Sequence, residues 1–309
     1  MKLGVGLAVM LLAGPVAAEP CGDLWRAVVQ AAPVVMSGTV ATEGEWCVIG
    51  DVVLDMPGEY APDWHADRLR IRGGALPWLA ALATTGAGGG AVPDRLEMAV
   101  EGLRLVVRTG DAQMDYLFAA QARASTINGA LALAWDAPER VLRLEALTVD
   151  FPGENALAIS GVVRGVDLSS TGAMQMSATG FAVTEVDLSL VMNGFVEWYL
   201  LLPLGQALLP LEGDMELEVS ELKTQVAQAI GGLPGASFSD KTKGAMMAFV
   251  RVLPNPAGTL TVALRSEAGV GPARALGYVM TGIPRSTAEA APAFDGVVIE
   301  VEWQDDAAQ

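Results

Sequence analysis

Few residues in this chain could carry out acid–base or nucleophilic chemistry. The single histidine, His65, is the one side chain whose ordinary pKa lies near neutral pH. A Ser-His-Asp hydrolase would have to use it, but no Gly-x-Ser-x-Gly turn occurs. His65 lies between Trp64 and a predicted strand, so we expect a polar residue at a strand entry. The minor alternative, with serine as nucleophile and His65 as base, would be excluded by full activity of His65→Ala.

Two further motifs match enzyme signatures only in part. Ser220 and Lys223 fit the S-x-x-K spacing of penicillin-recognising enzymes, but S-D-N and K-T-G are missing, and "SDKTKG" (239–244) only resembles them. "GAGGGA" (86–91) has the glycine spacing of a dinucleotide-binding turn, but it follows an apparent helix rather than a strand. We therefore predict no catalytic residue, no cofactor and a non-enzymatic protein.

The N-terminus has the pattern of a secretory signal peptide. Lys2 is followed by an apolar block and then by small residues, with Val16 and Ala18 placed for cleavage before Glu19. The apolar block is shorter than the roughly 20 residues needed to span a bilayer. We expect residues 1–18 to be removed and the mature chain to be periplasmic.

The cysteines of the chain are Cys21 and Cys47. Disulfides persist in oxidising compartments, so export predicts a bond between them. A redox C-x-x-C motif is absent, and with only His65 to help, a cysteine metal site lacks ligands.

A cluster of acidic residues does not have the spacing of a calcium loop. We expect a solvated acidic face, an adventitious cation remaining the alternative, and predict no metal site. The cluster comprises Glu43, Glu45, Asp51, Asp55, Glu59, Asp63 and Asp67.

Charge and composition exclude other classes of protein. The chain has 19 Lys and Arg against 36 Asp and Glu, a net charge of −17, so it should repel nucleic acid. It is 52% hydrophobic and 18% charged, which is too apolar for disorder, while its 35 Gly and 17 Pro argue against a long helical bundle.

Short apolar or alternating segments bounded by Gly, Pro, Asn or Asp predict strands at 46–56, 67–73, 95–107, 130–135, 140–151, 155–169 and 296–303. Turn residues at 136–139 and 152–155 favour successive hairpins. Helical spacing occurs at 23–32, 221–230 and 239–253.

A weak repeat runs through the predicted strands. Its units are "ADRLRI" at Ala66, "VEGLRL" at Val100, "LEALTV" at Leu144, "VTEVDL" at Val183 and "VSELKT" at Val219. In each unit two apolar residues stand three apart, so both can face the same side only across a bulge or kink. Chance occurrence in a β-rich chain is the alternative; a real repeat predicts a long, twisted, open sheet with one apolar face.

The segment "NGFVEWYLLLPLGQALLPLEG" (193–213) is the least polar part of the chain after the N-terminus. Glu197 and two prolines make a bilayer span improbable, and we predict no transmembrane segment in the mature chain. Two readings remain: the segment closes the core under the sheet, or it lines a groove for an apolar ligand. The groove reading uses the side chains of Phe195, Trp198, Tyr199 and Leu202.

Three arginines alternate along one predicted strand. Arg68, Arg70 and Arg72 share one face, with Leu69 and Ile71 on the other. They could bind phosphate groups of a lipid or an acidic partner, or form the solvated side of a half-buried strand.

Kinked strands behind a signal sequence, an apolar segment with helices, and "FVRVLPNPAGTLTVAL" (249–264) resemble exported proteins of Gram-negative envelopes, loosely of the AsmA and YdgA type. The resemblance covers roughly residues 64–265 and rests on no catalytic motif. It implies a long β-groove and a role in lipid traffic or envelope homeostasis. The chain lacks the N-terminal anchor usual for AsmA-type proteins.

The sequence therefore predicts an α+β fold, mostly β: a long twisted antiparallel sheet of successive hairpins, with a few helices packed in the C-terminal third. We expect a signal peptide (1–18) and one exported domain (19–309). That domain would comprise a disulfide-tied part (19–62), a repeat-like β part (63–220) and a mixed part (221–309). Two functions fit: binding of a lipid or other apolar ligand along a β-groove, or docking to another envelope protein through an exposed apolar patch.

Overall fold

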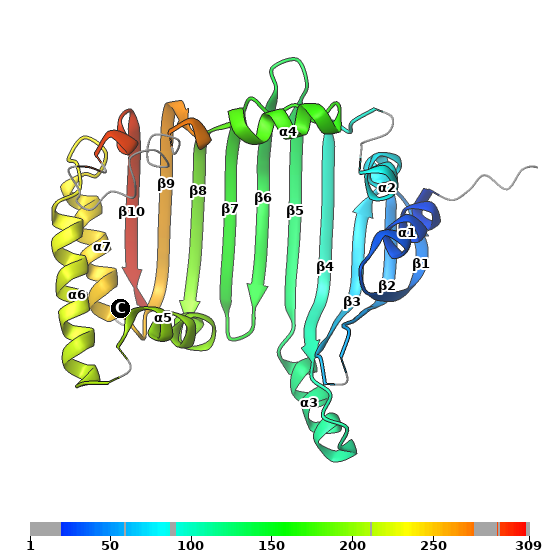
Figure 1. Ribbon diagram of the computed structural model, residues 1–309, viewed down its shortest axis with the longest axis horizontal. Helices are drawn as coiled ribbons and strands as arrows, with labels where there is room; N and C mark the ends of the chain where they lie inside the picture. Colours follow the sequence, from blue (N-terminus) through cyan, green and yellow to red (C-terminus); the bar gives the residue numbers. More distant parts are fainter. Residues whose placement is uncertain are drawn as a thin grey trace, which may run out of the picture.

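The chain forms one ten-stranded antiparallel sheet in which every strand pairs with its neighbours in sequence (Figure 1). The computed structural model describes residues 20–58, 60–86, 91–210, 212–274, 289 and 291–306. The strands are β1 (Val35–Glu43), β2 (Trp46–Asp55), β3 (Asp63–Arg72), β4 (Arg95–Val106), β5 (Ile127–Asp136), β6 (Val141–Phe151), β7 (Asn155–Arg164), β8 (Ala182–Asn193), β9 (Ala257–Val270) and β10 (Val297–Asp305). The predicted sheet of successive hairpins is confirmed.

The helices occur along the whole chain, not only in the C-terminal third. They are α1 (Pro20–Ala31), α2 (Leu76–Thr85), α3 (Ala112–Ala124), α4 (Thr171–Gly180), α5 (Leu201–Leu208), α6 (Met215–Gly231) and α7 (Asp240–Val252), with short turns η1 (Gly73–Ala75), η2 (Val196–Leu200) and η3 (Ala291–Phe294). The helices predicted from spacing correspond to α1, α6 and α7. The prediction missed α3, which buries no residue and so needs no apolar stripe.

Three of the four strands that carry repeat units have a register shift, whereas β3, which carries the first unit, pairs with β2 and β4 without one. Register shifts fall between Val100 and Leu103 in β4, and between Leu144 and Leu147 in β6. Each shift returns two apolar residues three apart to the same face of the sheet. A third shift follows Val183 in β8, whereas the fifth repeat unit lies on α6 and is not a strand.

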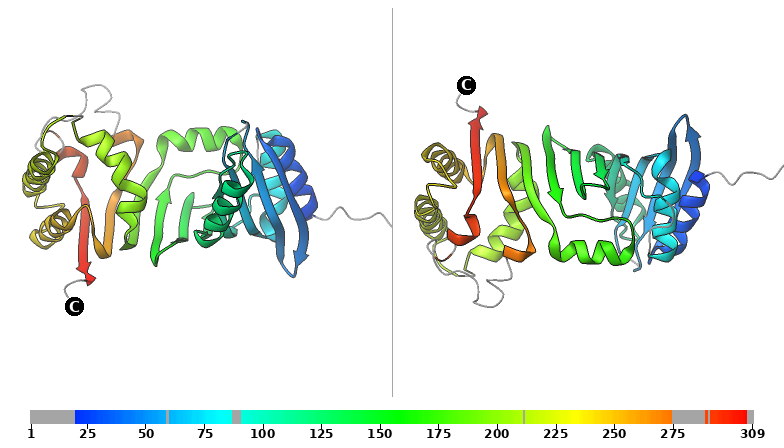
Figure 2. Two further views of the ribbon diagram at one scale, coloured as in Figure 1. Left: turned by 90° about the horizontal axis from the view of Figure 1, so that it is seen from below. Right: turned by 90° about the horizontal axis from the view of Figure 1, so that it is seen from above.

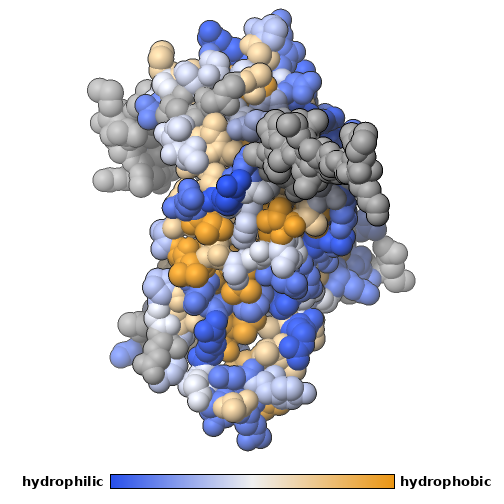
Figure 3. Space-filling model, turned by 90° about the vertical axis from the view of Figure 1, so that its right-hand side faces the viewer, coloured by the Kyte–Doolittle hydropathy of each residue, from blue (hydrophilic) through white to orange (hydrophobic). Residues whose placement is uncertain are grey.

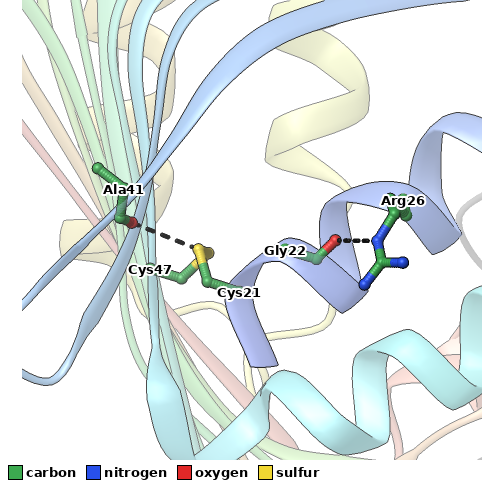
Figure 4. Close-up of a disulfide and its surroundings, with 5 residues drawn as sticks. All are labelled: Cys21, Gly22, Arg26, Ala41 and Cys47. Carbon is green, nitrogen blue, oxygen red and sulfur yellow. Dashed lines mark hydrogen bonds between the residues drawn. A yellow bond between two sulfur atoms is a disulfide. The ribbon is translucent and has the colours of Figure 1, made fainter. Parts of the chain in front are cut away.

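The β1 end of the sheet holds the tightest core. The disulfide between Cys21 and Cys47 ties α1 to β2 (Figure 4), as predicted. Ile49 and Ile71 on the sheet and Leu76 on α2 pack in the same buried cluster. Viewed from this end, hydrophobic side chains gather in the middle of the molecule between hydrophilic margins (Figure 3).

At the other end α7 packs against β10 and α6 packs against α7 (Figure 1). The rings of Phe249 and Trp303 meet at 5.2 Å between centroids. Ser239 caps α7 by accepting a hydrogen bond from the Thr242 amide at 3.1 Å. The molecule is thus a long sheet with a helix pair at each end (Figure 2).

Candidate functional site: the apolar face and its lower-end cavity

One face of the sheet is apolar from β2 to β10. Directly paired residues on neighbouring strands share a face, so the ladder defines continuous rows across the sheet. We call this side the apolar face. Its first row is Cys47, Ile71, Met98, Leu131, Leu147, Ile159, Leu188, Val262 and Val301, and its second is Ile49, Leu69, Val100, Gly129, Val149, Leu157, Leu190, Leu260 and Trp303.

The middle of the apolar face carries no helical layer. Over the described residues, α1 and α2 pack at one end and α7 at the other, and no helix packs extensively on β5 to β8 (Figure 2). Leu147, Ile159 and Leu188 are accordingly half-buried, whereas Cys47 and Ile71 in the same row are buried at the covered end. A sheet face of this composition is normally packed against another layer.

A cavity of about 570 Å³ opens at the lower end of this face, where β4 ends and β5 begins. The helix α3 forms one wall with Phe118 and Ala122, and η2 forms the opposite wall with Trp198 and Tyr199. The remaining lining residues are Leu105, Val107, Gln121, Ser125, Ile127, Pro152, Gly153, Asn155 and Asn193. This mixture of apolar walls with a few amides is typical of small-molecule sites.

Three aromatic rings position the η2 wall. Phe151 at the end of β6 lies 5.2 Å from Phe195 and 5.4 Å from Tyr199, and the latter two rings are 5.1 Å apart. Such edge and tilted contacts stabilise beyond the area they bury. Burial raises the pKa of the Tyr199 hydroxyl above its ordinary value.

Hydrogen bonds hold the floor and the α3 wall. The buried Asn155 side chain donates to the Pro152 carbonyl at 2.7 Å and accepts from the Asn193 amide at 2.5 Å. Asp111 caps α3 by accepting from the amides of Gln113 and Met114, each at 2.9 Å. Asp115 accepts from the Thr109 amide and hydroxyl, and these bonds lower the pKa of its carboxyl group.

The four apolar residues proposed for a groove occupy different positions in this arrangement. Trp198 and Tyr199 line the cavity, while Phe195 packs behind them in the aromatic cluster. Leu202 does not line it, and its surface is 71% exposed. The segment is therefore only partly core: Val196 is buried, but most of α5 is exposed.

The arginine row lies on the opposite, polar face of the sheet. Arg68 pairs with Glu43 at 3.4 Å and Arg70 with Glu101 at 2.7 Å. Arg72 pairs with both Glu45 and Glu97 at 2.8 Å, and these hydrogen bonds raise the pKa of its guanidinium group. The structure thus does not bring the arginines together with the apolar cavity.

The polar face has a shallow hollow of its own, also about 570 Å³. Small side chains such as Ala146, Ala158 and Ser189 form its floor. Glu145, Asp187, Glu300 and Glu302 are the carboxylates along it, and Arg265 pairs with Asp187 at 2.6 Å. Leu147, Ile159, Leu188 and Val262 of the apolar rows also contribute to its lining, but no aromatic ring does, so its chemistry differs from that of the first cavity by its carboxylates.

The residues considered for catalysis have structural surroundings. His65 on β3 pairs across the ladder with Arg104, and burial together with the Arg104 charge lowers its pKa. Lys223 donates to the carbonyls of Arg251 at 3.2 Å and Leu253 at 2.5 Å, which holds the end of α7 against α6. The motif at 86–91 lies largely outside the described residues.

No protein-family model matches the chain, and no curated protein matches its sequence at a significant level. Among the described residues, no three His, Cys, Asp or Glu side chains are grouped so that they could hold a metal ion. None of the described helices is long and apolar enough to cross a membrane.

Proposed function

We propose that this protein binds a lipid or another long apolar molecule along its apolar face, without catalysing a reaction. The acyl chain would lie over the half-buried rows of β5 to β8 and enter the cavity between α3 and η2. The resemblance to AsmA-type and YdgA-type proteins also favours lipid binding, and it stays a prediction. So do the three-part division of the chain and its export to the periplasm.

The observation that carries the proposal is the uncovered middle of the apolar face. Leu147, Ile159 and Leu188 retain partial contact with water although paired residues at the ends of the same rows are buried. Covering such side chains contributes about 25 cal/mol per Å² of apolar area. An acyl chain laid across several strands would therefore gain several kcal/mol before the cost of ordering it is subtracted.

The charges of the molecule limit the ligand. With a net charge of −17, the protein should not attract anionic headgroups from a distance. The amides of Asn155 and Asn193 at the cavity are neutral donors and acceptors. We therefore expect affinity to come from the apolar chain and selectivity among headgroups to be weak.

The test is lipid retention by the protein and two matched variants. Leu188→Gln places an amide in the middle of the apolar face, whereas Ser189→Gln places the same side chain on the polar face. Native mass spectrometry and lipid extraction should recover phospholipid or fatty acid from the wild type and from Ser189→Gln, and much less from Leu188→Gln.

A wild-type protein that carries no lipid and takes up no fluorescent fatty acid would contradict the proposal. Equal retention by the two variants would contradict it as well. If the wild-type protein neither carries lipid nor takes up fatty acid, docking to an envelope protein becomes the better account of the apolar face.

A further inference from the structure

Exposed apolar side chains gather at one end of the strands. We call this end the lower edge: the start of β1, the loop between β2 and β3 with the start of β3, the ends of β4 and β8, α3, η2, α5 and the start of α6 (Figure 1). The large exposed apolar residues there are Val35, Tyr60, Trp64, Leu105, Val107, Met114, Tyr116, Leu117, Trp198, Tyr199, Leu200, Leu201, Leu202, Leu204, Leu208, Met215 and Leu217. Among the described residues, the others of this kind are Val40, Met176, Val226 and Val298.

The centre of the lower edge carries no charge. No Asp, Glu, Lys or Arg occurs between Glu197 and Glu212, a segment that includes all of α5. Trp198 is 80% exposed and Leu202 71%, and no residue of α5 is buried. A helix that is apolar nearly all round is expected inside a core or in contact with lipid, and α5 is not inside the core.

The aromatic residues of the lower edge are of the type found where proteins meet a membrane. Tyr60, Tyr116 and Tyr199 all lie there, together with Trp64 and Trp198. Tyr and Trp combine an apolar ring with one polar group, which favours the boundary between acyl chains and headgroups.

We propose that the lower edge docks on the surface of a lipid bilayer, with α5 inserted among the headgroups, the start of α3 at their surface, and no segment crossing the membrane. Two separate helices and a loop contribute apolar residues side by side along one edge. A fluid lipid surface can accept such a set without a matching shape, whereas a folded protein partner would need one.

Charge selects between two modes of membrane binding. The charges near the lower edge are mainly acidic: Asp111 and Asp115 lie in the same turns of α3 as its exposed apolar residues, and Asp214, Glu216 and Glu218 lie at the start of α6. The basic residues nearby are Arg108, which pairs with Asp63, and Arg123 at the end of α3. Attraction to anionic lipid therefore cannot drive docking, and insertion of apolar side chains must. Binding should then occur on zwitterionic bilayers and change little with salt.

The experiment measures sedimentation with vesicles of phosphatidylcholine, and with vesicles that also contain phosphatidylglycerol. The protein is compared with Leu202→Gln and with the matched control Met176→Gln. Met176 is 78% exposed but lies on α4 at the opposite edge. Since all forms share the same N-terminus, residues 1–18 affect them equally.

We expect the wild type and Met176→Gln to bind phosphatidylcholine vesicles equally, and Leu202→Gln to bind about tenfold more weakly. Phosphatidylglycerol should not strengthen binding. Brominated acyl chains should quench part of the tryptophan fluorescence, and Trp198→Phe should remove much of that quenching. Circular dichroism confirms that the exposed substitutions leave the fold intact.

Absence of wild-type binding to either vesicle would overturn the proposal, as would equal weakening by the two Gln variants. Binding that requires phosphatidylglycerol and disappears in salt would overturn the insertion mode. If the wild type binds no vesicles but forms a dimer that Leu202→Gln dissociates, the lower edge would instead be an interface with a second copy of the chain. The docking proposal is independent of lipid retention by the apolar face. Leu188→Gln, which tests lipid retention, should therefore leave vesicle binding unchanged.

Discussion

At the scale of single residues, Asn155 is a buried polar side chain that joins three segments at the cavity. It donates to carbonyls of the β6–β7 turn and of Asn193, and it accepts from the Asn193 amide. Removing one partner leaves buried polar groups without hydrogen bonds, which costs about 1–3 kcal/mol. We expect Asn155→Ala to lower the free energy of unfolding by that amount in urea denaturation.

Gln113→Ala is the control, because Gln113 is an exposed amide side chain on α3, the helix that forms one wall of the same cavity. A loss as large as that of Asn155→Ala would show that the Asn155 network has no special role.

His65 allows the pH dependence of stability to be tested at one residue. It is the single histidine of the chain, so its imidazole signals in an NMR spectrum can be assigned without ambiguity. Burial, then the charges of Arg104 and Arg108, lower its pKa, while Asp63 opposes them. A folded-state pKa below the ordinary 6.5 means that the unfolded chain binds the proton more tightly. The contribution to stability is present above pH 6.5 and lost as pH falls.

We therefore expect NMR titration of His65 to give a pKa below that of the urea-unfolded chain. His65→Asn should lose less stability than the wild type as the pH falls from 6.5 to the lower folded-state pKa of His65. A native pKa at or above the unfolded value would contradict this account.

At the scale of elements, the disulfide attaches the helix α1 covalently to the strand β2. Its bond spans 26 residues, and the chain-entropy model assigns about 3.5 kcal/mol to a loop of that length. Replacing Cys21 and Cys47 by Ala should lower the free energy of unfolding by roughly this amount. Equilibrium denaturation of the oxidised wild type and the double variant measures the difference; equal stabilities would show that the bond constrains little.

Most strands and the kinks of β4, β6 and β8 could be predicted because both depend on local pattern. The prediction missed β1, whose residues are mostly exposed, and β9. Leu144 and Leu147 stand three apart, and only a bulge can place both on one face. The helices α3 and α4 could not be predicted this way, because they lie along the sheet edge and bury little apolar surface. Their signals are caps instead: Asp111 for α3 and Ser170 for α4.

At the scale of the whole molecule, the sequence predicts an apolar face but not whether another layer covers it. Leu188 has the same neighbours in sequence whether a helix packs on it or not. The cavity likewise brings Phe118 together with Trp198, two residues that are distant in the chain, and no spacing rule connects them. Only Trp198 and Tyr199 among its lining residues had a signal, the apolar run around them.

The strictly sequential order of the sheet has a consequence for how the molecule forms. Because every strand pairs with its neighbours in the chain, most contacts close over short loops, and topologies of that kind fold quickly. The hairpins can be added one after another from the N-terminus as the chain emerges. The 63-residue interval between β8 and β9 is the longest exception, since 193 and 257 bound it and α5 to α7 lie within it. The last two strands should thus be the last to join the sheet, and the length of the sheet could change in evolution by whole hairpins without disturbing either end.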